Sequence, residues 1–142
     1  MTIRPIEPSD AATWERLRRE LWPEDPESHA VEVASFFAGT LPEPQAVLVA
    51  QEGPNLIAFA ELSIREDIRG LAGTRVGYVE GLYVTPAFRS RGIARTLLLA
   101  SKSWARENHC EAFASDRAER LIVDPKFCLG RTIPPRRVRL HS

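Results

Sequence analysis

The sequence predicts an α+β domain built around a mixed, mostly antiparallel sheet with helices on its faces. A short strand pattern and two helical patterns come first, apolar runs separated by short turns follow, and a strand–helix–strand unit lies near residues 76–115. Short turns favour antiparallel pairing, whereas the strand–helix–strand unit requires a parallel pair. The chain has 142 residues, so we expect a single domain over residues 1–142, with an atypical segment at 117–142.

The first strand and helix are predicted from the N-terminal segment. Residues 2–6 (TIRPI) alternate weakly between apolar and polar side chains, as a half-buried strand does. Residues 8–10 (PSD) then supply turn and N-cap chemistry. Trp14, Leu17 and Leu21 share one helical face, and a proline soon after ends the helix.

A second helix and a hairpin come next. Residues 27–38 carry an apolar stripe at helical spacing, and Gly39 is a typical helix stop. Residues 45–52 and 55–67 are rich in apolar and β-branched side chains. Because Gly53-Pro54 separates them, the two runs predict a hairpin.

The strand–helix–strand unit completes the predicted fold. After a loop, residues 75–84 (RVGYVEGLYV) predict a strand. Helical spacing then continues to Asn108, which suits a left-handed cap, and residues 111–116 (EAFASD) predict one more strand. The segment after Asp116 has three prolines and no sustained period, so no element is assigned there.

The composition, 44% hydrophobic and 27% charged, is that of a soluble globular protein. No apolar run approaches the roughly 20 residues that cross a bilayer, so no membrane partner is expected. The N-terminus lacks the apolar segment of a secretory signal, so we expect a cytoplasmic protein in which Cys110 and Cys128 stay reduced. No pair of histidines has metal-ligand spacing, and no metal site is predicted.

The balance of charge argues against a nucleic-acid partner. The formal net charge is zero, which offers little non-specific attraction to phosphates. No acidic residue follows Asp124, and the segment beyond it is basic. We interpret these basic residues as solvated charge near a terminus, with phosphate contact as the alternative.

The turn between the strand 75–84 and the next helix carries the clearest chemical signal. It places Arg89, Arg91 and Gly92 at a helix N-terminus, where the first amides lack intrahelical acceptors and the helix dipole favours anions. Neither the P-loop pattern nor the dinucleotide GxGxxG pattern is present. The turn therefore predicts a pyrophosphate site of another kind, with a charged surface turn as the alternative.

These residues resemble the signature of a known family. Arg89-Ser90-Arg91-Gly92-Ile93-Ala94 resembles the Arg/Gln-x-x-Gly-x-Gly/Ala loop of the GNAT acetyltransferase superfamily, which holds the pyrophosphate of coenzyme A. The stretches LWP, VEGLYVTPAFRSRGIARTLL and EAFASD are similar, in order and spacing, to aminoglycoside 6′-N-acetyltransferases over about residues 1–116. The resemblance implies a GNAT-like fold, acetyl-CoA as cofactor, and acetylation of the 6′-amine of aminoglycosides, which causes antibiotic resistance.

The resemblance also implies roles along the strand before the turn. The backbone amides of Leu82, Tyr83 and Val84 would meet the acetyl and pantetheine groups, because a bulge splays this strand in the superfamily. We expect the Tyr83 ring itself in the core. Glu80 interrupts an apolar strand, and the resemblance implies that it faces the acceptor amine as anchor or base. A salt-bridged or outward-facing glutamate is the alternative.

Asp116 and Trp22 complete the predicted acceptor site. The resemblance implies that Asp116 is a second catalytic and substrate-binding carboxylate, with a helix-capping or turn aspartate as the alternative. It implies that Trp22 forms a wall of the aminoglycoside pocket. An aromatic face beside Glu24, Asp25 and Glu27 suits a polycationic sugar, although a purely structural tryptophan is the alternative.

Several functional questions stay open from the sequence. Tyr78 and Tyr83 are the only tyrosines, and both precede the turn. The tyrosine that protonates the thiolate in the superfamily therefore has no counterpart, and the general acid is either water or absent. The alternative functions are a GNAT enzyme for another small amine or a peptide N-terminus, and a catalytically degenerate acyl-CoA-binding protein. The resembled enzymes are commonly dimers, so a homodimer is expected.

Overall fold

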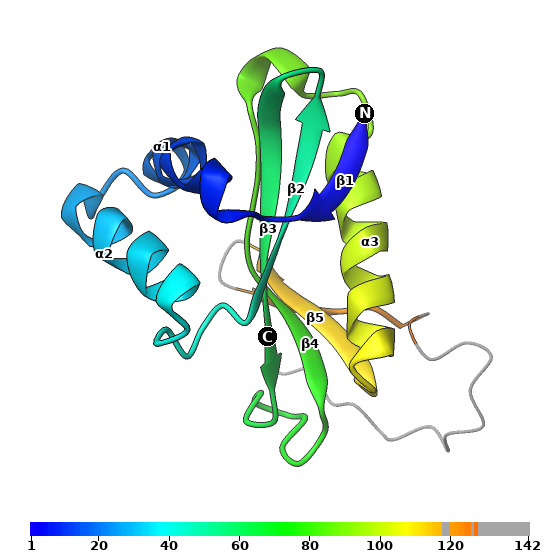
Figure 1. Ribbon diagram of the computed structural model, residues 1–142. Coiled ribbons are helices and arrows are strands. Elements are labelled where there is room, and N and C mark those ends of the chain that lie inside the picture. The colour runs from blue at the N-terminus through cyan, green and yellow to red at the C-terminus, as the bar shows by residue number, and fades with distance from the viewer. Residues whose placement is uncertain (118–119, 126, 128–142) are drawn as a thin grey trace.

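A six-stranded sheet in the order β1-β2-β3-β4-β5-β6 forms the centre of the computed structural model, which describes residues 1–117, 120–125 and 127 (Figure 1). The elements are β1 (Thr2–Pro5), a 3₁₀ turn (Pro8–Asp10), α1 (Ala11–Leu21), α2 (Pro26–Ala38), β2 (Ala46–Glu52), β3 (Asn55–Arg65), β4 (Val76–Val84), a 3₁₀ turn (Pro86–Phe88), α3 (Ile93–Glu107), β5 (Ala112–Arg117) and β6 (Arg120–Val123).

The pairing of the strands confirms the predicted mixed, mostly antiparallel sheet. Each neighbouring pair is antiparallel except β4 and β5, which are parallel and joined through α3. The hairpin of β2 and β3 turns at Gly53, whose φ of 56° is left-handed. Since residues 128–142 lie outside the described part of the chain, a single domain over the whole chain stays a prediction.

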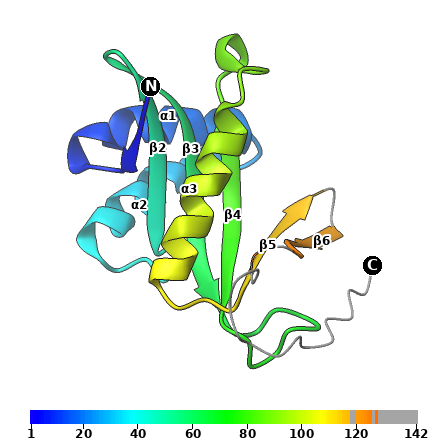
Figure 2. The same ribbon diagram turned by 90° about the vertical axis from the view of Figure 1, so that its right-hand side faces the viewer.

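Helices cover both faces of the sheet. Figure 2 shows α3 across one face and α1 and α2 behind the other. On the α1–α2 side, Trp14, Leu17 and Val33 pack against Phe59 and Tyr83 of the sheet. A larger cluster buries one side of α3 against the opposite face. Within the described residues, no helix has the length and apolar character needed to cross a membrane.

Two details differ from the sequence predictions. Asn108 has a φ of −93° and is not left-handed; its side-chain Nδ2 donates to the carbonyl of Trp104 at 2.8 Å, and His109, with a φ of 61°, makes the left-handed turn instead. β6 was not predicted because a four-residue strand is too short to show a period, but it pairs with β5 along Ala114–Arg117.

The sheet opens where β4 is irregular. Glu61 pairs with Gly81 and Leu62 pairs with Val79, so Glu80 is an extra residue in β4, a β-bulge. β4 pairs with β5 only along Val76–Val79. Beyond that point β5 turns away from β4, as Figure 2 shows, and leaves an opening in the sheet.

Candidate active site

A cavity of about 320 Å³ occupies the opening between β4 and β5, and we call it the splay cleft. It is lined by Leu21, Trp22, Val79, Glu80, Gly81, Leu82, Leu98, Ser115 and Asp116. Its walls are mostly apolar, and two carboxylates face it. The cleft therefore lies beside the part of β4 that has no β5 partner.

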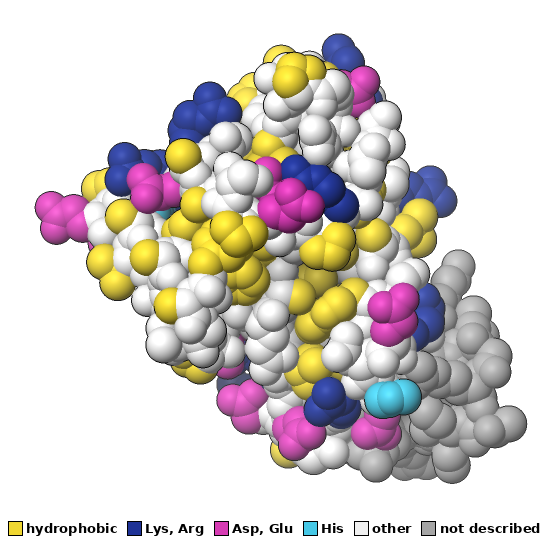
Figure 3. All heavy atoms as spheres, viewed as in Figure 1, with side chains coloured by type: hydrophobic (Ala, Val, Ile, Leu, Met, Phe, Trp, Pro, Cys, Tyr) yellow, Lys and Arg dark blue, Asp and Glu magenta, His cyan; other side chains and the backbone are white. Residues whose placement is uncertain are grey.

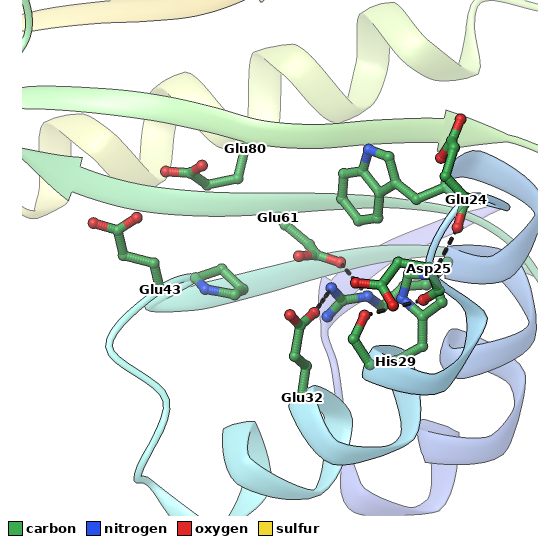
Figure 4. A pocket seen from close by; sticks show the side chains of 11 residues that line it. Glu24, Asp25, His29, Glu32, Glu43, Glu61 and Glu80 are labelled. Atoms are coloured by element: carbon green, nitrogen blue, oxygen red, sulfur yellow. Dashed lines mark hydrogen bonds and ion pairs between the residues drawn. The ribbon is translucent and has the colours of Figure 1, made fainter.

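A second cavity of about 400 Å³, the acidic pocket, lies between the helices α1 and α2 and the strands β3 and β4 (Figure 4). Its lining is Arg18, Trp22, Glu24, Asp25, Ser28, His29, Glu32, Glu43, Pro44, Glu61 and Glu80. Acidic side chains outnumber the single guanidinium in this lining, so the pocket favours a ligand with several positive charges. On the face of the molecule that Figure 3 shows, by contrast, charges of both signs lie around an apolar centre.

Glu80 lies where the cavities meet. A third cavity of about 480 Å³ on the other side of Glu80 is lined by Arg65, Tyr78 and Asp116 among others. Glu80 lines all three cavities, whereas Trp22 and Asp116 each line the splay cleft and one neighbouring cavity. The structure thus brings together the three side chains that the sequence assigned to the acceptor.

Glu80 is ion-paired, as the alternative interpretation of the sequence proposed. Its Oε1 accepts from Arg65 Nε at 2.8 Å and lies 2.7 Å from Nη2 of the same residue. Nη2 also contacts Glu43 at 2.6 Å. Glu80 remains half-buried in the cavity lining, so the ion pair orients its carboxylate without removing it from the site.

Asp116 belongs to a strand and is neither a helix cap nor part of a turn. It lies in β5, next to the point where β5 leaves β4, and accepts a hydrogen bond from the hydroxyl of Tyr78. Burial and this contact with Asp116 both raise the pKa of Tyr78 far above its usual value. Tyr78 therefore stays a protonated donor that orients the carboxylate.

Trp22 lies against β4 between the acidic pocket and the splay cleft. Its indole stacks on the His29 ring with centroids 6.3 Å apart, and the Arg18 guanidinium lies 5.2 Å from its centroid. A Cβ on Gly81 would come within 2.5 Å of Trp22 Cη2, so only glycine there allows this approach. Of the predicted acidic neighbours Glu24 and Asp25 line the pocket, but Glu27 is absent from its lining.

The predicted pyrophosphate turn has the backbone of an anion site. Ser90 and Gly92 both have positive φ, 65° and 77°, a backbone conformation that occurs in anion-binding turns. The first helical bond runs from Thr96 N to Gly92 O, so the earlier amides of α3 have no intrahelical acceptor. Arg89 Nε donates to the carbonyl of Val84 at 2.9 Å and ties the turn to the strand.

The remaining residues of the predicted cofactor site surround this turn. Ile93 is buried under it and Ala94 partly so, while the Arg91 guanidinium lies 5.0 Å from the Phe88 ring. A Cβ on Gly92 would meet no atom within 4 Å, so the space beside this glycine is open. The turn therefore fits a pyrophosphate, the group that its amides and arginines were predicted to bind.

The strand that leads into the turn is arranged as predicted. Leu82, Tyr83 and Val84 pair with β3 on one side and have no β5 partner on the other. Tyr83 is buried in the core, and its hydroxyl donates to Glu20 at 3.0 Å. This edge of the strand thus has no neighbouring strand among the described residues to pair with, and its residue Leu82 lines the splay cleft.

Sequence reasoning missed a buried network in the acidic pocket. Arg18 is ion-paired with Glu32 and lies 3.5 Å from Glu61, and burial raises the pKa of Glu61 to about 7. His29, which was assigned no site, is buried and its Nε2 contacts the Trp22 carbonyl at 2.8 Å. Two signals in the sequence could have indicated this network: an arginine at an otherwise apolar helical position and a glutamate within an apolar strand. Among the described residues, no group of three or more possible ligands is arranged to hold a metal ion.

Comparison with known proteins gives consistent relatives. Residues 13–122 match the model of the acetyltransferase (GNAT) family. The chain is 42% identical over 117 residues to aminoglycoside N(6′)-acetyltransferase type 1 of Klebsiella aerogenes, which covers 80% of this chain and 76% of that protein. The protein of the same name from Stenotrophomonas maltophilia is 36% identical over 116 residues, or 81% of this chain and 74% of that one.

Solved structures show the same fold. The structure of AAC(6′)-Iy in complex with the bisubstrate analogue CoA-S-monomethyl-acetylneamine superposes with a TM-score of 0.73 at 31% identity, over 82% of this chain and 79% of that one. The apo aminoglycoside 6′-N-acetyltransferase AAC(6′)-IG of Acinetobacter haemolyticus gives a TM-score of 0.73 at 30% identity, over 100% of this chain and 98% of that one.

Proposed function

This chain belongs to the acetyltransferase (GNAT) family, as the resemblance at residues 89–94 predicted, and on that premise we propose that it transfers an acetyl group from acetyl-CoA to the 6′-amine of an aminoglycoside. The observation that carries the proposal is the position of Glu80. This carboxylate lies where the acidic pocket meets the splay cleft. A polycation in the pocket would thus present an amine beside a thioester in the cleft.

The cofactor half of the site would be held by backbone groups. Residues 90–94 supply the amides for the pyrophosphate, and Arg89 and Arg91 add charge-assisted donors. The edge of β4 at Leu82–Val84 pairs with no described strand on this side, Leu82 lines the splay cleft, and backbone groups of this edge would hydrogen-bond the pantetheine arm and the acetyl oxygen. When bound, acetyl-CoA supplies the thioester carbonyl that the amine attacks.

The acceptor half would be held by charge and stacking. Trp22 offers an aromatic wall to the sugar, and the carboxylates of the acidic pocket bind its ammonium groups. Asp116, oriented by Tyr78, faces the acceptor from β5. These contacts would hold the 6′-amine beside Glu80. Holding the amine in position in this way supplies most of the rate gain that comes from proximity.

Glu80 would accept the proton that the amine must lose before or during attack, directly or through one water. The amine nitrogen then bonds to the carbonyl carbon, the carbon–sulfur bond breaks, and the sulfur takes a proton. Both tyrosines of the chain are held by carboxylates, Tyr78 by Asp116 and Tyr83 by Glu20. We therefore assign the proton on sulfur to water.

Thiol release tests the proposal directly. Purified protein with acetyl-CoA should release coenzyme A in the presence of aminoglycosides that bear a 6′-amine, and much less with analogues that carry a 6′-hydroxyl. NMR of the product should place the acetyl group on the 6′-nitrogen. If acetyl-CoA binds and another small amine or a peptide N-terminus is acetylated, but no such drug is, then the proposed acceptor is wrong and the proposed cofactor is right.

We also propose a cytoplasmic homodimer. A cytoplasmic location agrees with the supply of acetyl-CoA there. Among the described residues β6 is the last strand in the sheet order, and Ile122 on it is 45% exposed, which supports a subunit contact at this edge. Light scattering on a size-exclusion column should give twice the chain mass, and a monomer mass would refute the dimer.

A further inference from the structure

Ser115 is a residue of the splay cleft that the proposed chemistry does not use. It lies on β5, and its Cα pairs with that of Val79, the last residue of β4 that pairs with β5. Beyond this pair β5 turns away from β4, as Figure 2 shows, so Ser115 stands where the cleft begins. Among the described residues that line the cleft, Ser115 carries the only hydroxyl group.

The alternation of β5 places Ser115 and Asp116 on opposite faces of the sheet. Ser115 shares the face of Phe113, which packs in the cluster under α3. Asp116 shares the face of Ala114, which packs with Tyr78 in a separate cluster. The cleft therefore has a hydroxyl group on its α3 side and a carboxylate on its other side.

The other lining residues of the cleft follow the same division. Leu82 and Leu98 pack against the cluster under α3, whereas Leu21 and Trp22 pack with the cluster under α1 and α2. The turn that is proposed to hold the pyrophosphate begins α3, and the acidic pocket is bounded by α1 and α2. The α3 side of the cleft is therefore its cofactor side, and the opposite side is its acceptor side.

The hydroxyl of Ser115 is available to a ligand. Ser115 is half-buried, and its Oγ is not sealed from solvent. Within the described part of the chain, no hydrogen bond occupies this hydroxyl. Because a hydroxyl has one proton to donate and two lone pairs, Ser115 can donate to one group and accept from a water molecule at the same time.

Acetyl transfer needs different groups at the amine and at the sulfur. The amine loses a proton, which a carboxylate on the acceptor side can accept, whereas the sulfur leaves with negative charge and is stabilised by a donor. An ionised carboxylate cannot donate, and the hydroxyls of Tyr78 and Tyr83 already donate to Asp116 and Glu20. Of the described residues on the cofactor side of the cleft, Ser115 has the side chain that can donate.

We propose that the Ser115 hydroxyl donates a hydrogen bond to the sulfur of coenzyme A as the carbon–sulfur bond breaks, and holds the water that supplies the proton on sulfur. Ser115 passes its proton to the sulfur and takes one from this water, so the serine ends unchanged. The hydroxide left behind is neutralised by the proton that Glu80 took from the amine. This inference rests on the proposed acetyl transfer and adds a catalytic residue to it.

The thiol of bound coenzyme A provides a readout that does not depend on turnover. A hydrogen bond from Ser115 favours the thiolate, so the pKa of the bound thiol should be lower in the wild type than in Ser115→Ala by about 1, the tenfold effect of a charge-assisted hydrogen bond. Ultraviolet absorbance of the thiolate, titrated against pH, measures this pKa. The same titration with desulfo-coenzyme A, which has no thiol, subtracts the protein's own cysteines.

Steady-state kinetics provides a second readout. Ser115→Ala should lower kcat about tenfold and change the KM for the acceptor less than about twofold. Ser103→Ala removes an exposed serine of α3 and should change neither. Ser115→Thr and Ser115→Val have nearly the same shape and both favour a strand, so they differ mainly in the hydroxyl. The threonine variant should keep most of kcat and the valine variant should not, which repeats the test if Ser115→Ala does not fold.

The outcomes separate this role from others. An equal thiol pKa in the wild type and Ser115→Ala, or an equal kcat in Ser115→Thr and Ser115→Val, would overturn the contact with sulfur. A Kd for coenzyme A that rises about tenfold in Ser115→Ala with an unchanged thiol pKa would assign the hydroxyl to the pantetheine arm and overturn it too. If no amine is acetylated while the thiol pKa still differs, the acetyltransferase activity is refuted and the contact of Ser115 with sulfur is supported.

Discussion

Replacing Gly81 by alanine tests the position of Trp22 as a wall of the acceptor site. Gly81 lies under the indole, and an added Cβ would stand 2.5 Å from Cη2 and 2.6 Å from Cζ2 of Trp22. Carbon atoms in contact prefer about 3.5–4.0 Å, so the ring must move by about 1 Å. Since Trp22 also stacks on His29 and Arg18, the movement disturbs the wall of the acidic pocket.

The expected effect follows from this displacement. A shift of about 1 Å in a positioning group can cost roughly 100-fold in rate, so kcat/KM for the aminoglycoside should fall about 10- to 100-fold. The KM for acetyl-CoA should change less than about twofold, because the turn at 89–94 is untouched. Overpacking should lower the free energy of unfolding by about 1–3 kcal/mol.

Steady-state thiol release with each substrate varied in turn measures both effects. Gly77→Ala is the matched control on the same strand, since its Cβ would meet Ala105 Cβ at 2.6 Å on the α3 side, far from Trp22. It should lose stability and keep the acceptor KM. In a Trp22→Ala background, Gly81→Ala should add little further loss. An unchanged kcat/KM for Gly81→Ala, or equal losses for both substrates, would refute the reasoning.

Three further predictions follow from the site. Arg89→Ala should raise the Kd for coenzyme A about tenfold, by loss of a charge-assisted donor and of its tie to the strand. Arg95→Ala, which removes an exposed helix residue, should leave this Kd unchanged, and titration calorimetry with coenzyme A measures both. Tyr78→Phe should lower kcat/KM for the acceptor about fivefold and leave the KM for acetyl-CoA alone, because Asp116 loses its orienting hydrogen bond; equal effects on both substrates would contradict this role. The pKa of Glu61 rises from 4.5 to about 7 on folding, so its contribution to stability is full below pH 4.5 and is lost as the pH rises through 7. The free energy of unfolding of the wild type should therefore fall by up to about 3 kcal/mol over that range. Urea titrations should show a smaller fall in Glu61→Gln.

Local sequence was sufficient for the parts of the site that the backbone builds. The turn at 89–94 needs a strand before it, a helix after it and a glycine with positive φ, and all three are adjacent in the sequence. Glu80 could also be found locally, because a carboxylate within an apolar strand stands out. Its ion pair with Arg65 could not, since the partner lies on another strand and the register between them depends on the bulge.

Contacts between distant segments explain what the sequence did not reveal. Arg18 and Glu61 come into contact because α1 packs across β3, and no spacing of residues along the sequence predicts this pair. Nothing in the sequence singles out Gly81, and its role becomes visible only with Trp22 lying against it. His29 was assigned no site because no pair of histidines has metal-ligand spacing, but in the structure its Nε2 contacts the Trp22 carbonyl.

One extra residue in β4 accounts for much of the site. Glu61 and Ser63 are two apart on β3 and share a face, so their cross-strand partners Gly81 and Tyr78 share it too, although three positions separate them. The bulge at Glu80 therefore places Gly81 under Trp22 and Tyr78 toward Asp116 on one face, with its own carboxylate between them. In a regular strand, Gly81 and Tyr78 would lie on opposite faces. The irregularity that breaks the sheet is thus also what gathers the acceptor residues around Glu80.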